Sequence, residues 1–168
     1  MLFRSEQFGG NPLAVFPDAQ GLDDETMQRI AREFNLSETI FMFPAERDDC
    51  TVKVRIFTPY FELPFAGHPT VGGAFVMATI GAIPLSGAVT EIAFEEGVGR
   101  VPISVYADEK GNVTKAVLSA AVVPEIMEGA PSAALMTEVL SLTAGDVLSE
   151  ALSPQIVKAG TPRLFAPI

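Results

Sequence analysis

Apolar residues recur along the first part of the chain with two different periods. Between residues 23 and 35 they are spaced as on one face of a helix, at Met27, Ile30, Ala31 and Phe34. Asp23 is a residue type that caps a helix start, and Asn35 is one that tolerates the left-handed backbone at a helix end. The pattern predicts a helix that is capped by Asp23 and runs to about Phe34.

A period of two replaces this pattern in the next segments. Thr39–Phe43 is a β-branched and aromatic run closed by Pro44, and Thr51–Thr58 alternates apolar with polar residues. We expect these two strands to pair antiparallel around the polar loop that ends at Cys50. A further short strand is expected over Asn11–Phe16.

A second helix is predicted over Thr70–Ile80, with Pro69 in its first turn and Gly81 at its stop. The small residues 72–74 inside it indicate that another element packs closely there. From Val89 onward three strands with glycine-rich turns follow, at Val89–Phe94, Arg100–Tyr106 and Val113–Ser119.

The residue pattern changes in the last part of the chain, after residue 123. Pro124–Ser132 is expected to be a linker, Ala134–Leu142 a helix, and Ile156–Pro167 has strand character. Together the elements predict an α+β protein with one domain over residues 1–123 and a second, incomplete one over residues 124–168.

The composition of the chain limits the classes of partner it can bind. The chain has 168 residues, 48% of them hydrophobic, so it can bury a core. A net charge of −10 argues against nucleic acid and anionic membranes, which need basic surfaces. No apolar run is long enough to span a membrane and no signal-peptide pattern follows Met1, so we expect a soluble, cytoplasmic protein. The lone Cys50 excludes a disulfide framework and a cysteine-based metal cluster.

The candidate chemistry rests on one histidine and one glutamate. His68 is the only histidine, and both it and Glu38 lie where one predicted element ends and the next begins. Such a pair suits proton transfer, because an imidazole and a partly desolvated carboxyl can exchange a proton. No phosphate loop, dinucleotide fingerprint or metal-ligand cluster is present, so we expect no cofactor and no metal.

Three segments resemble the phenazine-biosynthesis PhzF-like proteins, relatives of diaminopimelate epimerase. They are Gly10-Asn11-Pro12-Leu13-Ala14-Val15, Asn35-Leu36-Ser37-Glu38-Thr39, and Arg55-Ile56-Phe57-Thr58-Pro59 running into Glu62-Leu63-Pro64-Phe65-Ala66-Gly67-His68-Pro69-Thr70. Their order and spacing match the N-terminal half of the family, and the rest of the chain is similar to the start of the second half.

The resemblance implies a fold of two similar lobes, each a curved, mostly antiparallel sheet or barrel around a central helix. It implies that the second lobe is largely missing here, because the acidic motif with Asp-Pro-Ala-Thr-Gly-Ser character on its side of the cleft has no counterpart. Family members need no cofactor. Ala66 stands where the related two-thiol racemases have a cysteine, which disfavours racemisation by paired thiols.

The resemblance also assigns the site. It implies Glu38 as the catalytic acid and base and His68 as its catalytic partner, on a small carboxylated metabolite. Gly67, Pro69 and Thr70, at the start of the second helix, are expected to bind the substrate carboxylate. Asn11 and Ser37 are expected to orient the substrate by hydrogen bonds, although structural capping explains each of them equally well.

The function implied is therefore a cofactor-independent isomerase that shifts a proton on its substrate. The alternative is a truncated, inactive remnant or a ligand-binding lobe of such an enzyme. A single lobe would expose apolar surface, so we expect a homodimer or association with a complementary half.

Overall fold

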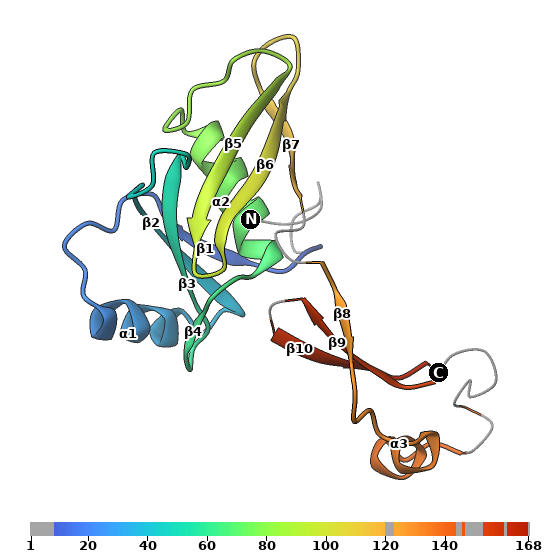
Figure 1. The fold of residues 1–168 in the computed structure, drawn as a ribbon. Coiled ribbons are helices and arrows are strands. Elements are labelled where there is room, and N and C mark those ends of the chain that lie inside the picture. The colour runs from blue at the N-terminus through green and yellow to red at the C-terminus, as the bar shows by residue number, and fades with distance from the viewer. Residues whose placement is uncertain (1–8, 120–122, 144–145, 147–152, 160, 168) are drawn as a thin grey trace. The chain divides into compact units, whose positions relative to one another are not determined.

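A computed structural model describes residues 9–119, 123–143, 146, 153–159 and 161–167 (Figure 1). The chain forms two compact units, residues 1–121 and residues 122–168. The sequence placed the division after residue 123, and the assignment of these units to the two family lobes stays a prediction.

The first unit is built on one seven-stranded sheet. Its strand order is β1-β2-β3-β5-β6-β7, and β4 pairs with β3 outside this path. Strands β1 and β2 are parallel, as are β3 and β5, and the other pairs are antiparallel. The strands are β1 (Leu13–Phe16), β2 (Glu38–Pro44), β3 (Val52–Phe57), β4 (Glu62–Leu63), β5 (Val89–Glu96), β6 (Gly99–Ala107) and β7 (Val113–Leu118). The expected α+β class and the antiparallel pair around the Cys50 loop are confirmed.

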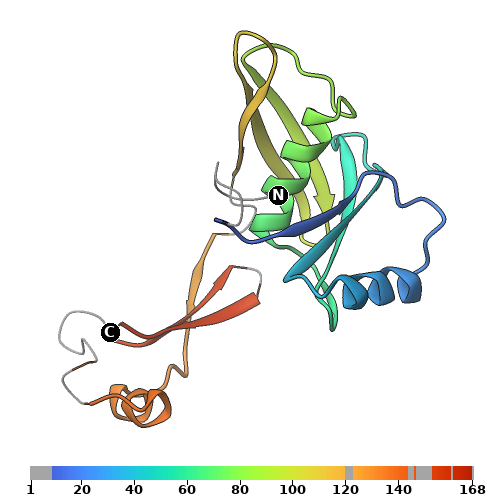
Figure 2. The same cartoon turned by 180° about the vertical axis from the view of Figure 1, so that it is seen from behind.

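Two helices lie on different sides of this sheet (Figure 2). Helix α1 (Asp24–Phe34) contacts β2 and β3, and helix α2 (Gly67–Thr79) contacts β7, β1, β2 and β6. Helix α1 is capped as predicted, because the Asp23 carboxylate accepts a 2.7 Å hydrogen bond from the Thr26 amide and Asn35 adopts a left-handed φ of 50°. Because α2 contacts β1 and β7, the strands at the two ends of the sheet order, it is the central helix of a half-barrel.

Helix α2 begins three residues earlier than the predicted start at Thr70. Pro69 occupies its third position, which is tolerated because the first amides of a helix have no partner inside it. The residue before the helix is Ala66, whose side chain makes no capping hydrogen bond. The sequence signal for this start was therefore absent, and the prediction placed it too late.

The alternation of β2 explains how both sheet faces are covered. Ile40 and Met42 point into the core around α2, whereas Phe41 belongs to a separate cluster with Met27 and Ala31 of α1. Glu38 has the same parity as Ile40 and Met42, so it lies on the α2 side of the sheet. The close packing predicted for residues 72–74 is confirmed at Gly73, where a Cβ would collide with Met42.

The described residues of the second unit form a three-stranded antiparallel sheet and one helix. Strands β8 (Glu125–Met127), β9 (Gln155–Ala159) and β10 (Thr161–Phe165) pair in the order β10-β9-β8, and α3 spans Ala133–Leu140. The prediction that Pro124–Ser132 is a linker was wrong over Glu125–Met127. These three residues become a strand through pairing with β9, a long-range contact that local composition does not encode. Within the described parts of both units, no helix is long and apolar enough to cross a membrane.

Candidate active site

The candidate site forms where three elements begin. Strands β1 and β2 are parallel neighbours with Leu13 opposite Glu38, so the residues that precede them lie at the same edge of the sheet. Helix α2 packs on both strands and starts at this edge, bringing His68 there. The fold thus brings together Asn11, Ser37, Glu38 and His68, all of which the sequence had singled out.

Glu38 and His68 form the centre of the site. The Glu38 Oε2 atom lies 3.1 Å from His68 Nδ1. The Glu38 and His68 side chains retain 21% and 16% of their exposure, so the pair is mostly enclosed. The far ring nitrogen of His68, Nε2, lies 3.0 Å from the backbone carbonyl oxygen of Asn11.

The Asn11 carbonyl fixes the histidine tautomer. A carbonyl oxygen only accepts hydrogen bonds, so His68 Nε2 must carry a hydrogen and donate it. The other ring nitrogen, Nδ1, faces Glu38. The 3.1 Å contact fits either of two arrangements: a neutral Glu38 donating to Nδ1, or a Glu38 carboxylate accepting from the imidazolium.

A second contact on Nδ1 involves Asn11 and Ser37. The Ser37 hydroxyl donates to Asn11 Oδ1 at 3.0 Å, which turns the amide nitrogen Nδ2 toward the ring, 3.3 Å from His68 Nδ1. An amide N–H is a donor, so in this contact Nδ1 is the acceptor. Asn11 and Ser37 thus orient the histidine; their contact with substrate stays a prediction.

The other residues predicted to bind substrate differ in how far they are buried. Gly67 and His68 are partly exposed at the start of α2, whereas Pro69 and Thr70 are buried. The Thr70 hydroxyl lies 2.8 Å from the Ala66 carbonyl and 2.7 Å from Glu96 Oε1. Of this turn, Gly67 and His68 therefore offer surface to a substrate, and substrate binding by Pro69 and Thr70 remains a prediction.

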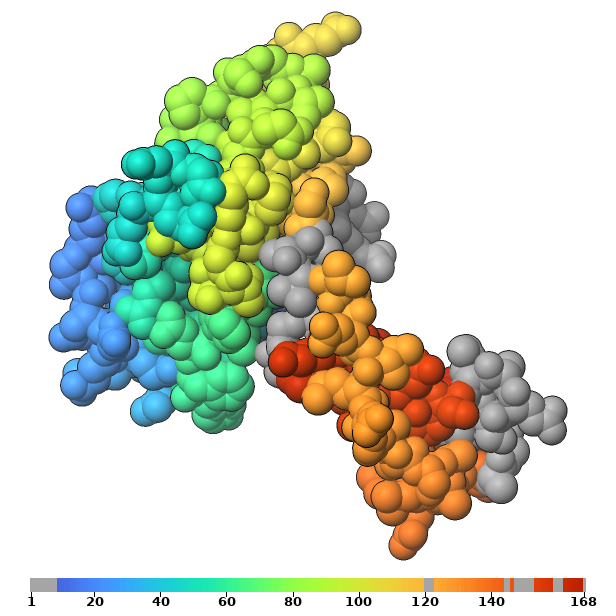
Figure 3. Space-filling view, in the orientation of Figure 1, coloured from blue at the N-terminus to red at the C-terminus, as the bar shows by residue number. Residues whose placement is uncertain are grey.

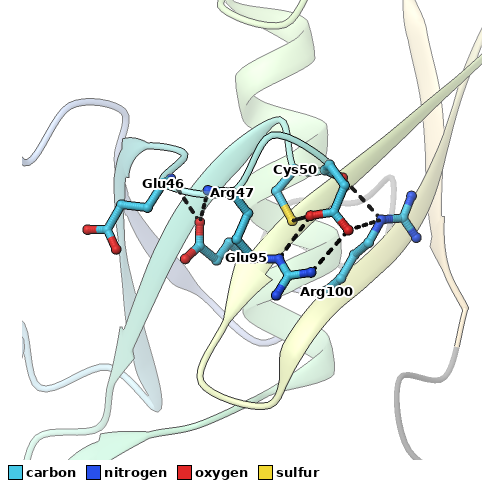
Figure 4. Close-up of polar contacts among 6 residues, drawn as sticks. Glu46, Arg47, Cys50, Glu95 and Arg100 are labelled. Carbon is cyan, nitrogen blue, oxygen red and sulfur yellow. Dashed lines mark hydrogen bonds and ion pairs between the residues drawn. The ribbon is translucent and has the colours of Figure 1, made fainter.

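Cys50 lies in a separate polar cluster at the loop between β2 and β3 (Figure 4). Its sulfur is 3.7 Å from Asp49, which also forms ion pairs with Arg47 and Arg100. Burial and then the Asp49 carboxylate raise the pKa of the Cys50 thiol, which opposes formation of a nucleophilic thiolate. In the same cluster the Glu95 carboxylate accepts hydrogen bonds from two backbone amides of the loop.

Sequence reasoning missed one buried acid close to the site. Glu96, at the end of β5, is only 7% exposed, and burial raises its pKa to about 7 although the Thr70 hydrogen bond opposes this. In the sequence it was only one half of the pair Glu95-Glu96. Only the long-range placement of the β5 end against α2 distinguishes it from a solvated acid.

Comparison with known proteins supports this picture at the level of the family. A family model described as phenazine biosynthesis-like protein matches residues 2–168. An uncharacterised isomerase of Pasteurella multocida is 60% identical over 76 residues, which cover 45% of this chain and 26% of that protein. The trans-2,3-dihydro-3-hydroxyanthranilate isomerase of Pseudomonas aeruginosa is 43% identical over 106 residues, covering 61% of this chain and 34% of the relative.

A solved structure agrees over nearly the whole chain. The structure of a predicted epimerase from Pseudomonas aeruginosa superimposes with a TM-score of 0.81 at 29% identity, covering 99% of this chain and 57% of that one. The chain therefore spans just over half the length of this relative, and its aligned segments span 26% and 34% of the two isomerases.

Proposed function

The chain belongs to the phenazine biosynthesis-like protein family, and we propose that it provides the proton-transfer half of a cofactor-independent isomerase acting on a small carboxylated metabolite. The observation that carries this proposal is the 3.1 Å contact between Glu38 Oε2 and His68 Nδ1, with the opposite ring nitrogen committed to the Asn11 carbonyl.

In the proposed reaction Glu38 acts as both base and acid. Its carboxylate removes a proton from one substrate carbon, the electron pair shifts through the adjacent double bond, and the protonated Glu38 delivers a proton to the second carbon. The substrate is isomerised and the enzyme returns to its starting state, so no co-reactant is consumed. His68 Nδ1, 3.1 Å from Glu38 Oε2, holds the carboxyl group in place during both transfers.

The surroundings of the pair support this substrate class. The exposed part of the first turn of α2, at Gly67, lies next to His68, and helix N-termini favour anions. A carboxylate bound there would hold the reacting carbons near Glu38. The relative named for trans-2,3-dihydro-3-hydroxyanthranilate provides a probe compound of this class.

Solvent deuterium incorporation into that probe tests the proposal. We expect label uptake with the wild-type chain and at least a hundredfold slower uptake with Glu38→Gln, because general acid–base catalysis contributes on the order of 10²–10⁴-fold. Undiminished uptake in Glu38→Gln would refute the role of Glu38. If neither protein exchanges while the Pseudomonas aeruginosa isomerase does in the same assay, the chain is a ligand-binding lobe or an inactive remnant.

We further propose that the chain works in an assembly, as a homodimer or with a complementary half. Large apolar side chains are exposed on each unit: Tyr60 is 78% exposed in the first, and Ile126 and Val139 are 69% and 67% exposed in the second. Exposed apolar groups of this size favour association. Light scattering should show a dimer; a monomer would rule out the homodimer and leave the complementary half to be sought by co-expression.

A further inference from the structure

The segment that carries His68 is held from one side by the β5–β6 hairpin. The turn of this hairpin packs beside the segment that follows β4 (Figure 3). There the Val98 amide donates to the Pro64 carbonyl at 3.2 Å, and a Cβ at Gly97 would lie 2.8 Å from Pro64 Cα. Along the chain, His68 lies between Pro64 and Thr70. Thr70 is held by a second contact with the same hairpin, because its hydroxyl lies 2.7 Å from Glu96 Oε1.

The hydrogen bonds at Thr70 depend on the protonation of Glu96. Thr70 has one hydroxyl hydrogen, but its oxygen lies within hydrogen-bond distance of two acceptors, the Ala66 carbonyl at 2.8 Å and Glu96 Oε1 at 2.7 Å. One hydrogen cannot serve both. If Glu96 Oε1 carries a proton and donates it to Thr70, the hydroxyl is free to donate to Ala66, and the chain of hydrogen bonds is complete.

The other carboxyl oxygen points to the same protonation state. Glu96 Oε2 is buried and has no hydrogen-bond partner among the described residues. A buried oxygen without a partner costs far less free energy in a neutral carboxyl than in a carboxylate. Burial thus favours the neutral form, which also satisfies Thr70.

No charged neighbour offsets this preference. Glu96 lines a surface hollow and lies next to β6 and α2. The charged or titratable groups on these neighbouring elements are Lys53, Arg55, Glu62, Glu95, Arg100 and His68. Among described residues the two β3 cations pair with other carboxylates, Lys53 with Glu46, and Arg55 with Asp24 and Glu62. Glu96 forms no ion pair within that part of the chain.

We propose that Glu96 is a positioning residue for the isomerase site, acting as a neutral acid that, through Thr70 and Ala66, fixes the first turn of α2 and with it His68. This inference rests on the proposed function. When Glu96 ionises, the Thr70 hydroxyl turns to the carboxylate and Ala66 loses that donor. The Ala66 carbonyl also accepts the Thr70 amide at 3.2 Å, so the Thr70 hydroxyl adds a second, side-chain hydrogen bond between the residue before α2 and its first turn.

The single histidine of the chain gives a direct readout. Ring signals of a labelled sample report on His68 alone, and no turnover is required. We expect the wild-type His68 signals to match those of Glu96→Gln at about pH 5.5 and to depart from them by about pH 8.5, because the glutamine amide donates to Thr70 at every pH. Glu91→Gln, an exposed acid on the same strand, is the control and should follow the wild type.

Thr70 provides a second, independent test. Thr70→Val should displace the His68 signals at both pH values, and Thr70→Ser, which keeps the hydroxyl, should restore them. In the exchange assay Thr70→Val is expected to be about tenfold slower, the equivalent of about one lost hydrogen bond. Identical His68 signals in wild type, Glu96→Gln and Thr70→Val at both pH values would overturn the inference.

The two proposals fail differently. If the His68 signals behave as expected but no protein exchanges label, positioning holds and the proposed isomerase function fails. If exchange depends on Glu38 while the His68 signals ignore both Glu96 and Thr70, the isomerase function holds and the positioning role is overturned.

Discussion

Replacing Glu96 by glutamine should remove a large part of the pH dependence of stability of the first unit. Burial raises the pKa of Glu96 from its ordinary value of 4.5 to about 7. Between these two values the folded protein binds more of this proton than the unfolded chain does, so stability falls as the pH rises through this window. Above about pH 7 both states are ionised and the contribution is constant.

The magnitude follows from the two pKa values. Each pH unit of difference corresponds to about 1.4 kcal/mol, so wild type loses about 3 kcal/mol through Glu96 over the whole window. About 2 kcal/mol of this falls between about pH 5.5 and about pH 8.5. Glutamine has no proton to lose, so the difference in unfolding free energy between Glu96→Gln and wild type should grow by that amount in favour of the variant.

Urea unfolding followed by tyrosine fluorescence measures this difference. The chain has no tryptophan, and both tyrosines, Tyr60 and Tyr106, lie in the first unit. The pH dependence of all other groups cancels in the comparison of variant with wild type, and Glu91→Gln should show no such trend. A difference that stays constant between these pH values would refute the argument that Glu96 is buried as a neutral acid.

Two further predictions concern the site and its support. Ser37→Ala should slow label exchange about fivefold, because the Asn11 amide loses the hydrogen bond that orients it toward His68, whereas Ser37→Thr keeps the hydroxyl and should stay within about twofold; equal rates for both variants would contradict this. Gly97→Ala should lower the unfolding free energy by about 1–3 kcal/mol in urea titrations, because its Cβ would meet backbone atoms of Pro64. The matched Gly67→Ala, with only an ordinary 3.4 Å contact, should not, and equal stability of the two variants would show that the hairpin does not press on this segment.

Local signals in the sequence predicted much of the first unit. Helix α1 was bounded correctly because its cap residues, Asp23 and Asn35, are of types that work through contacts within a few residues. The antiparallel pairing of β2 with β3 around the Cys50 loop was predicted from the strand patterns and the polar loop between them. These features depend on short-range geometry, which is why the pattern was sufficient.

Long-range contacts decided the rest. The meeting of Asn11 with His68 depends on the parallel pairing of β1 and β2 and on the start of α2, neither of which has a local signal. Strand β8 exists only through its pairing with β9. The buried state of Glu96 arises from the hairpin position and could not be distinguished from that of the other acids by composition.

The most direct test of the central claim is a label-transfer experiment on the Glu38–His68 pair. The probe dihydro-hydroxyanthranilate is deuterated at the carbon that loses its proton, and the product is analysed after reaction in ordinary water. If Glu38 removes and returns the proton, part of the deuterium appears at the second carbon with the wild-type chain, and neither product nor transfer is seen with Glu38→Gln. Product formed by Glu38→Gln at the wild-type rate would contradict the account.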